Sequence, residues 1–218
     1  MRIAIAGAGN VGRAIARELL DNGHQVLLID KDPKALKLES VPDAEWLMAD
    51  ACEITSLDNA HLNNCQVLVA ATGDDKANLV TSLLGKTEYG VPRVVARINH
   101  PKNEWLFDSS WGVDVAVSTP RIISALVEEA VSVGDVVRLF SFRKGQANLV
   151  ELTLPDGSAC IGKTVEEIEL PENAALSAIV RDGRVITAQA HDVFAAGDEL
   201  LFIASADAEA QIKACFIS

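Results

Sequence analysis

The sequence is poor in several features that would assign it to common classes of protein. Its 218 residues include only 19 Lys and Arg against 31 Asp and Glu, for a formal net charge of −12. Nucleic acids and anionic membrane surfaces are bound through basic faces, so this charge argues against both as partners. The longest apolar stretches, such as VLVAAT, are strand-sized and fall far short of the ~20 residues of a membrane span. Because the chain starts with a strand and a glycine loop instead of a leader, we expect a soluble cytoplasmic protein.

Cysteine is scarce and its spacing is uninformative. Cys52, Cys65, Cys160 and Cys215 lie far apart, and no CxxC pair occurs. Such spacing is atypical of a disulfide framework or a zinc site, so we expect reduced, buried thiols and no metal centre.

Side chains suited to acid–base catalysis are also few. The only tyrosine, Tyr89, is followed four places on by Arg93, so the chain has no Tyr-x-x-x-Lys pair. Of the four histidines, only His100 comes at the end of a predicted strand, and it directly precedes Pro101 at the start of a predicted helix. Hydride transfer to a carbonyl normally needs a positioned acid or base. We therefore predict no catalytic residues.

What the first part of the chain does contain is an alternation of strands and helices. Its apolar runs are short, β-branched and continuous, as in strands buried on both faces of a parallel sheet. The predicted strands are Ile3–Ala6, Val26–Asp30, Trp46–Ala49, Val67–Thr72, Val94–Ile98 and Val113–Val117. Helices are predicted between them, including one that starts at Asp32 and Pro33, and another follows the last strand from Pro120 to Val133. Residues 1–134 should thus form a Rossmann-like, doubly wound parallel α/β domain.

Residues 135–218 are predicted to form a small α+β C-terminal module. This region is rich in strands and has short helices predicted around residues 164–168 and 207–215. Turns are predicted at four glycine-containing dipeptides. These are Lys144–Gly145, Asp156–Gly157, Asp182–Gly183 and Gly197–Asp198.

A glycine fingerprint follows the first strand. In GAGNVG, Gly7 permits a tight turn, Gly9 lets the backbone approach a pyrophosphate, and Gly12 allows the helix to pack closely on the strand. The N-terminus of that helix attracts phosphate. Asp30, at the end of the second strand, could accept hydrogen bonds from a ribose diol and would repel the 2′-phosphate of NADP. The alternative is a plain glycine turn with an incidental aspartate.

Further polar residues follow the third to fifth strands, at the edge of the sheet where ligands bind. Asp50–Cys52 could flank an adenine, and Thr72 with Gly73 could lie along the phosphates and the second ribose. Asp74 and Asp75 could belong to the site or only cap the next helix. Arg97, inside an apolar strand, needs either a phosphate or a carboxylate as its partner. For Arg13 we expect a place on the helix surface.

Five segments together resemble the N-terminal domain of the RCK (KTN) family, the regulatory subunits of Trk and Ktr potassium uptake systems. They are IAGAGNVGRAIARELLDNGHQVLLIDKDP, MADACE, AATGDDKANL, VARINHPKNEWLF and GVDVAVSTP. The stretch from ACIGKTVEEIELP to GDELLFIAS is similar to the family's C-terminal module. The resemblance covers nearly the whole chain and is strongest to single-copy, actinobacterial-type Trk regulators.

The resemblance implies a gating protein and not an enzyme. Family members bind NAD(H), ATP or ADP at the glycine loop, and their dimers assemble into a cytoplasmic ring beneath a membrane potassium-translocating subunit. The protein would thus be peripheral at the inner face of the cell membrane. The helix at 120–133 would contact a partner subunit. An NAD-dependent oxidoreductase is the alternative that the fingerprint alone suggests.

Together, the residues and the resemblance predict one cofactor-binding site. It comprises Gly7, Gly9, Asn10, Val11, Gly12, Asp30, Lys31, Asp50, Ala51, Cys52, Thr72, Gly73, Asp74 and Arg97. Ktr-type members often carry arginine where this chain has Asn10, which puts strong ATP-versus-ADP discrimination in doubt. Some family members bind cyclic di-AMP between C-terminal modules. Ala174–Val180 would suit such an interface, but we favour a core strand there.

Overall fold

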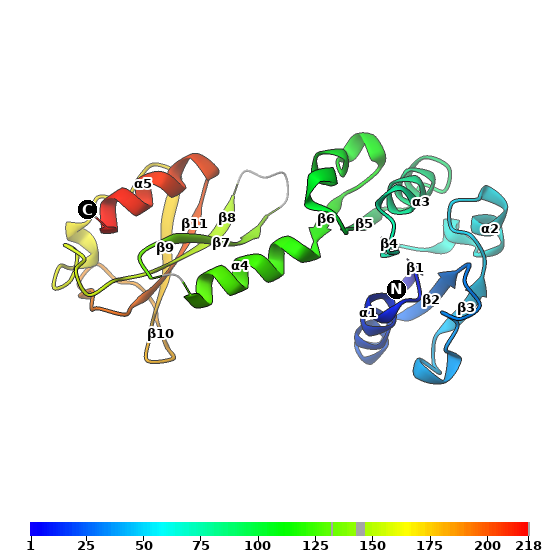
Figure 1. Ribbon diagram of the computed structural model, residues 1–218, viewed down its shortest axis with the longest axis horizontal. Coiled ribbons are helices and arrows are strands. Elements are labelled where there is room, and N and C mark those ends of the chain that lie inside the picture. Colours follow the sequence, from blue (N-terminus) through cyan, green and yellow to red (C-terminus); the bar gives the residue numbers. More distant parts are fainter. Residues whose placement is uncertain (132, 143–146, 218) are drawn as a thin grey trace. The chain divides into compact units, whose positions relative to one another are not determined.

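The computed structural model describes residues 1–131, 133–142 and 147–217. The chain divides into two compact units, residues 1–120 and 121–218, whose elements are labelled in Figure 1. The sequence placed the boundary at 134/135, after the helix that follows the sixth strand, whereas most of that helix is grouped here with the second unit. The turn predicted at Lys144–Gly145 lies outside the described residues.

The first unit is built on a six-stranded parallel sheet in the order β3-β2-β1-β4-β5-β6. This strand order and the helices between the strands are those of a Rossmann-like domain, as predicted. The strands are β1 (Arg2–Ala6), β2 (Gln25–Asp30), β3 (Glu45–Met48), β4 (Val67–Ala70), β5 (Arg93–Ile98) and β6 (Val115–Ser118). The α-helices are α1 (Asn10–Asp21), α2 (Ile54–Asn59) and α3 (Asp75–Thr87).

Both faces of this sheet are covered by helices. Successive side chains of a strand point to opposite sides of the sheet, so each strand contributes to a core on both faces. Along β1, Ile3 and Ile5 pack with Ala16 of α1, while Ala4 and Ala6 belong to the cluster that contains Leu57 of α2. The continuous apolar runs of the sequence are thereby explained: no strand face is left to solvent over the centre of the sheet.

The ends of the helices follow local sequence signals. Gly23, with φ of +78°, ends α1, where its N–H donates to the carbonyl of Leu20. Asp74 is the N-cap of α3, and its carboxylate accepts from the Lys76 N–H at 2.9 Å. These two boundaries fix where the strand-to-helix loops of the sheet begin and end.

The helix predicted from Asp32 onward is wrong. The Asp32 carboxylate does accept from the Lys34 N–H, but the segment forms only turns and a short 3₁₀ helix at Leu38–Ser40. Leu36 and Leu38 are two residues apart and cannot share one helical face, and Leu38 is exposed. The short α2 was not predicted.

The second unit contains α4 (Thr119–Val131), which begins at the end of the first unit, and an antiparallel sheet in the order β10-β9-β11-β8-β7. Its strands are β7 (Val136–Ser141), β8 (Asn148–Thr153), β9 (Ala174–Arg181), β10 (Arg184–Ile186) and β11 (Glu199–Ala204). The helix α5 (Ala206–Ile217) packs Ile212 and Phe216 into the core of this sheet. The predicted turn at Asp182–Gly183 joins β9 and β10, with both residues at positive φ.

Candidate functional site

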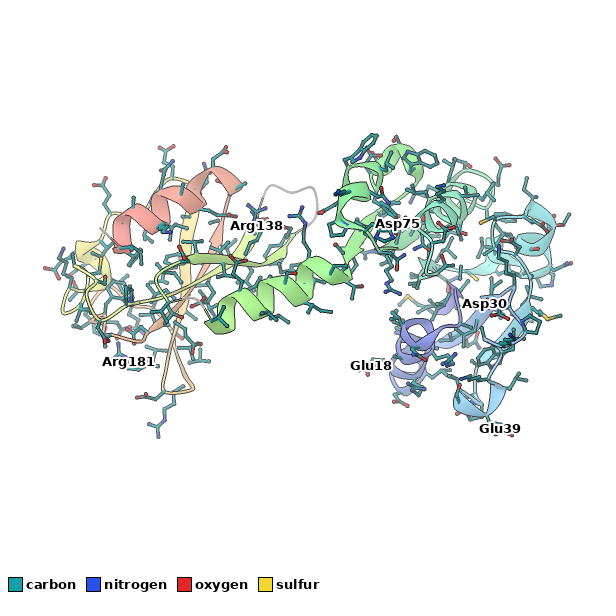
Figure 2. The ribbon with its side chains drawn as sticks, viewed as in Figure 1. Glu18, Asp30, Glu39, Asp75, Arg138 and Arg181 are labelled. Atoms are coloured by element: carbon teal, nitrogen blue, oxygen red, sulfur yellow. The ribbon has the colours of Figure 1, made fainter. Side chains whose placement is uncertain are left out.

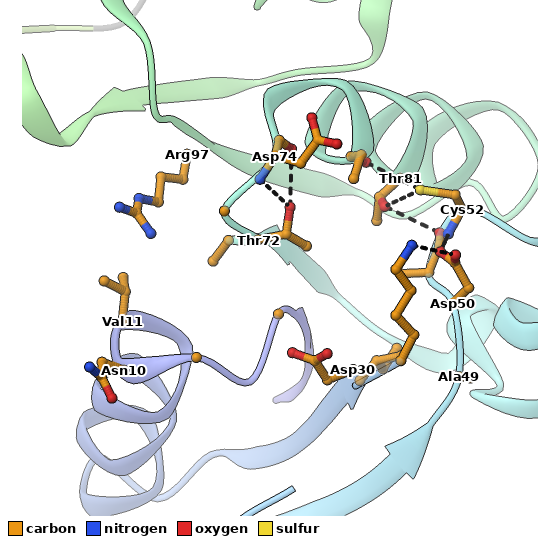
Figure 3. Close-up of a pocket in the computed structure, with 18 residues that line it drawn as sticks. Asn10, Val11, Asp30, Ala49, Asp50, Cys52, Thr72, Asp74, Thr81 and Arg97 are labelled. Atoms are coloured by element: carbon orange, nitrogen blue, oxygen red, sulfur yellow. Dashed lines mark hydrogen bonds and ion pairs between the residues drawn. The ribbon is translucent and has the colours of Figure 1, made fainter. Parts of the chain in front are cut away.

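A cavity of about 610 Å³ opens at the carboxyl ends of the parallel strands of the first unit. Every residue of the predicted site lines it except Gly12, which lies beneath the glycine loop. Figure 3 shows this cavity with α1 below it and α3 above it. Five further residues line it that the sequence did not single out. They are Ile29, Ala49, Ala71, Ala77 and Thr81.

The glycine loop owes its shape to two of its three glycines. Gly7 has a φ of +104°, and its N–H donates to the carbonyl of Ile29 at 2.8 Å. A Cβ on Gly12 would lie 1.8 Å from the carbonyl oxygen of Gly7, so only glycine lets α1 approach the loop. Gly9 is different, because a Cβ there would meet nothing within 4 Å. Gly9 is the N-cap of α1 and has no side-chain cap, so it leaves the start of this helix open toward the cavity.

Asp30 holds the loop from the neighbouring strand. One carboxylate oxygen accepts from the Ala8 N–H at 2.7 Å and the other from the Asp32 N–H at 2.9 Å. Each carboxylate oxygen has a second lone pair, so Asp30 can still accept from a ligand hydroxyl. Its position at the rim of the cavity is seen in Figure 3.

Arg13 does not lie on the helix surface as expected. It is 9% exposed and donates to the carbonyl of Ala8, to Oδ1 of Asn10 at 2.7 Å and to the carbonyl of Ala35 at 3.4 Å. A buried guanidinium is stable only when its donors are satisfied, and here backbone carbonyls satisfy them. Arg13 thus braces the glycine loop and fixes the amide of Asn10.

Opposite the glycine loop, Lys31 and Asp50 form an ion pair at the ends of β2 and β3, with Nζ 3.0 Å from Oδ2. The other oxygen of Asp50 accepts from the Cys52 N–H at 3.0 Å. The Cys52 N–H and then Lys31 hold the pKa of Asp50 below its usual value, and Asp50 raises the pKa of Lys31. Burial raises the pKa of the Cys52 thiol, whose sulfur lies 3.9 Å from Oγ1 of Thr81. A raised pKa disfavours the thiolate, which is the reactive form of cysteine.

Arg97 is the residue for which the sequence left open either a phosphate or a carboxylate as its partner. No ion pair joins it to the residues that the structure describes, and its Nε is buried without a hydrogen-bond partner among them. In Figure 3 the side chain points across the cavity toward Val11 in the first turn of α1. A half-buried arginine whose Nε is buried and unsatisfied, facing a helix N-terminus, suits an anionic ligand between them.

The two aspartates at the start of α3 have different places. Asp74 lines the cavity and also caps the helix. Asp75 is 4% exposed and does not line the cavity; its carboxylate accepts hydrogen bonds from Asn99, His100 and Asn103. The sequence left open whether these aspartates belong to the site or only cap the helix. Asp74 lines the cavity and also caps α3, whereas Asp75 lies outside the cavity.

Family models match both units of the chain. The model of the TrkA-N domain matches residues 3–119, and that of the TrkA-C domain matches residues 149–216. Over 213 residues the chain is 55% identical to the Trk system potassium uptake protein TrkA of Mycobacterium tuberculosis, covering 98% of this chain and 97% of that protein. The chain belongs to the TrkA family.

A more distant relative of this TrkA-family chain is the Trk system potassium uptake protein TrkA homolog of Methanothermobacter thermautotrophicus, 29% identical over 95% of each chain. Among solved structures, the GsuK RCK domain aligns with a TM-score of 0.66 and 17% identity over 100% of this chain and 48% of that chain. The GsuK channel bound to NAD aligns with a TM-score of 0.68 and 18% identity over 98% of this chain and 39% of that one. At these identities the structures show a shared RCK fold, and this chain spans less than half of either.

Tyr89 and His100, the two side chains weighed in the sequence for acid–base catalysis, lie outside the cavity of this TrkA-family chain. The hydroxyl of Tyr89 donates to the carbonyl of Ile54 and to Asp58, both at 2.8 Å, and neither Tyr89 nor His100 lines the cavity. No helix in the described ranges has the length and apolar character of a membrane span.

Proposed function

We propose that this chain is a cytoplasmic, nucleotide-sensing regulatory subunit of a Trk-type potassium uptake system. It binds an adenine nucleotide, NAD(H), ATP or ADP, in the cavity and controls a membrane potassium-translocating subunit, which holds it at the inner face of the membrane. The observation that carries this proposal is the arrangement of the open helix N-terminus at Gly9, the Asp30 carboxylate and the unsatisfied Arg97 around one cavity.

Each part of the cavity suits one part of an adenosine diphosphate group. The start of α1 and Arg97 face the same space, and both attract phosphate oxygens. Asp30 accepts from the ribose hydroxyls. The segment from Ala49 to Cys52 then flanks the adenine, with the Lys31–Asp50 pair at its edge. This part is common to NAD(H), ATP and ADP, so we propose the class of ligand and not one member.

We propose sensing and not catalysis because, in the part of the chain that the structure describes, no tyrosine or histidine lines the cavity. Tyr89 and His100 are outside it, and burial raises the pKa of the Cys52 thiol. A sensor needs only different affinities for two states of the assembly. A tenfold preference corresponds to about 1.4 kcal/mol, which is within reach of one charge-assisted hydrogen bond.

We further propose that the chain forms a homodimer through α4, and that dimers assemble into a larger ring. The support is an exposed apolar set on this helix: Ile123, Leu126, Val127 and Val131 are each more than half exposed, at 53–76%. Exposed apolar stripes of this kind mark association surfaces. Leu126→Glu should convert the dimer to a monomer in light scattering while its circular dichroism spectrum stays that of the folded chain, and Glu128→Gln on the same helix should leave the dimer intact. A Leu126→Glu chain that stays dimeric would contradict this interface.

Calorimetric titration tests the proposed ligand class. The wild-type chain is titrated with NAD, NADH, ATP and ADP, and cyclic di-AMP in parallel tests the second unit. We expect saturable binding of at least one adenine nucleotide, weakened about tenfold or more by Arg97→Ala because a charge-assisted contact is lost. Arg93→Ala is the matched control: Arg93 is on the same strand but exposed and outside the cavity. No binding of any of these ligands, or equal losses in both variants, would contradict the proposal.

A further inference from the structure

A fully buried polar side chain, that of Asn78, contacts two residues that line the phosphate end of the cavity. Asn78 of α3 is 0% exposed, and its amide contacts two neighbouring strand ends. Its Oδ1 accepts from the N–H of Thr72 at 2.9 Å and from Oγ1 of Thr72 at 2.7 Å. Its Nδ2 donates to the carbonyl of Thr72 at 3.2 Å and to that of Arg97 at 2.8 Å. Both acceptor and both donor positions of the amide are therefore used.

The carboxylate of Asp75 extends this arrangement. Asp75, at the start of α3 in Figure 2, accepts from the N–H and Nδ2 of Asn99 at 2.7 and 3.0 Å and from Nδ2 of Asn103 at 2.8 Å. Asn99 in turn donates to the carbonyl of Thr72 at 3.0 Å. Burial alone would raise the pKa of Asp75, but these hydrogen bonds outweigh it and hold the pKa below its usual value. We call Thr72, Asp75, Asn78, Asn99 and Asn103 the polar network.

The polar network lies where the backbone pairing of β4 with β5 stops. The register of β4 with β5 ends at Ala70 and Ala96. Beyond that pair, the amide of Asn78 joins the two strands by accepting from the Thr72 N–H and donating to the Arg97 carbonyl. These two residues also line the phosphate end of the cavity. Side-chain hydrogen bonds from Asn78 to both residues, and from Asn99 to Thr72, therefore join these two strand ends, while Arg97 is also paired with Val117 of β6.

We infer that Asn78 is a positioning residue for the phosphate-binding end of the cavity. It fixes the Thr72 main chain and the Arg97 backbone so that both face the same anionic group, and it does not touch the ribose end at Asp30. This inference rests on the proposed nucleotide binding and adds to it: the phosphate end depends on the polar network, and the nucleoside end does not.

The test compares adenosine with ADP. Asn78→Ala removes the four hydrogen bonds without adding charge, and it should weaken ADP binding about tenfold while adenosine binding changes by less than about twofold. Ser82→Ala is the control: Ser82 is equally buried on α3 and donates to the Asn78 carbonyl, not to its side chain. ADP is titrated by calorimetry, and weakly bound adenosine by NMR.

A double-mutant cycle separates positioning from general loosening of the fold. Because Asn78 acts partly through Arg97, the loss of ADP binding in Asn78→Ala together with Arg97→Ala should be smaller than the sum of the two single losses. Additive losses, or equal losses for adenosine and ADP, would overturn the inference. Should Asn78→Ala fail to fold by circular dichroism, Asn99→Ala, at a half-buried position, should show the same ADP-selective loss. A wild-type chain that binds neither ligand refutes the proposed function, whereas tight binding unaffected by Asn78→Ala refutes only this inference.

Discussion

The two glycines Gly9 and Gly12 should respond in opposite ways to the same small change. An added Cβ at Gly12 would lie 1.8 Å from the Gly7 carbonyl oxygen and 3.0 Å from its carbon. Both atoms are backbone, so the clash is relieved only if α1 moves off the sheet. Overpacking costs typically about 1–3 kcal/mol, and a clash with backbone lies at the upper end, so Gly12→Ala should lower the stability of the first unit by about 3 kcal/mol.

Gly9→Ala should leave the fold nearly intact and impair binding. Its Cβ would meet nothing within 4 Å, and the φ of −66° suits any residue. Alanine is a poorer N-cap than glycine, which costs about 1 kcal/mol at most. The methyl group would occupy the space where phosphate approaches the backbone. Losing hydrogen bonds to a charged group, about 1.5–3 kcal/mol, corresponds to about a 10- to 100-fold weaker Kd.

Thermal unfolding and calorimetric titration with ADP measure the two effects on the same samples. We expect a clearly lower melting temperature for Gly12→Ala, and a near-normal one with weak binding for Gly9→Ala. If Gly9→Ala binds ADP like the wild type, the phosphate does not lie where we place it. If Gly12→Ala melts like the wild type, the tight packing of α1 is not needed.

Three further predictions concern pH, an ion pair and a thiol. Burial and a hydrogen bond to a carboxylate raise the pKa of Tyr89 to about 12, so its contribution to stability should be complete below pH ~10 and lost as the pH rises through 12. Phenolate absorbance of this single tyrosine reports the midpoint, and a value near 10 would contradict the contact. Arg181→Ala leaves the carboxylate of Asp198, which is 0% exposed, without its cation. Because Arg181 is itself 37% exposed, urea unfolding should show a loss of about 2 kcal/mol, below the ~3–5 of a fully buried pair; no loss would refute the pairing. Iodoacetamide should label Cys52 slowly at neutral pH, and bound ADP should protect it but not Cys215, as measured by mass spectrometry; equal protection of both would place the ligand elsewhere.

The strands, the glycine loop and Asp30 could be predicted because each leaves a local mark in the sequence. Buried parallel strands read as short β-branched runs, and a glycine pattern between strand and helix has few other uses. One charged residue in an apolar strand singled out Arg97, but the pattern left open whether its partner was a phosphate or a carboxylate.

The polar contacts that brace the site could not be read in the same way. Asn78 and Asp75 look like ordinary polar residues at the start of a helix, and their partners at Arg97 and Asn99 are 19 and 24 residues away in the chain. Arg13 was misplaced because two of its three partners are backbone carbonyls, which have no sequence signature. Such contacts depend on how the loops meet in three dimensions.

Potassium flux tests the central claim most directly. Vesicles that contain the membrane potassium-translocating subunit are measured with and without this chain, in the presence or absence of ADP or NAD. We predict that nucleotide changes the flux when the wild-type chain is present, and that Arg97→Ala abolishes this response while Arg93→Ala keeps it. A flux that is the same with and without nucleotide, although the chain is bound to the vesicles, would contradict the account.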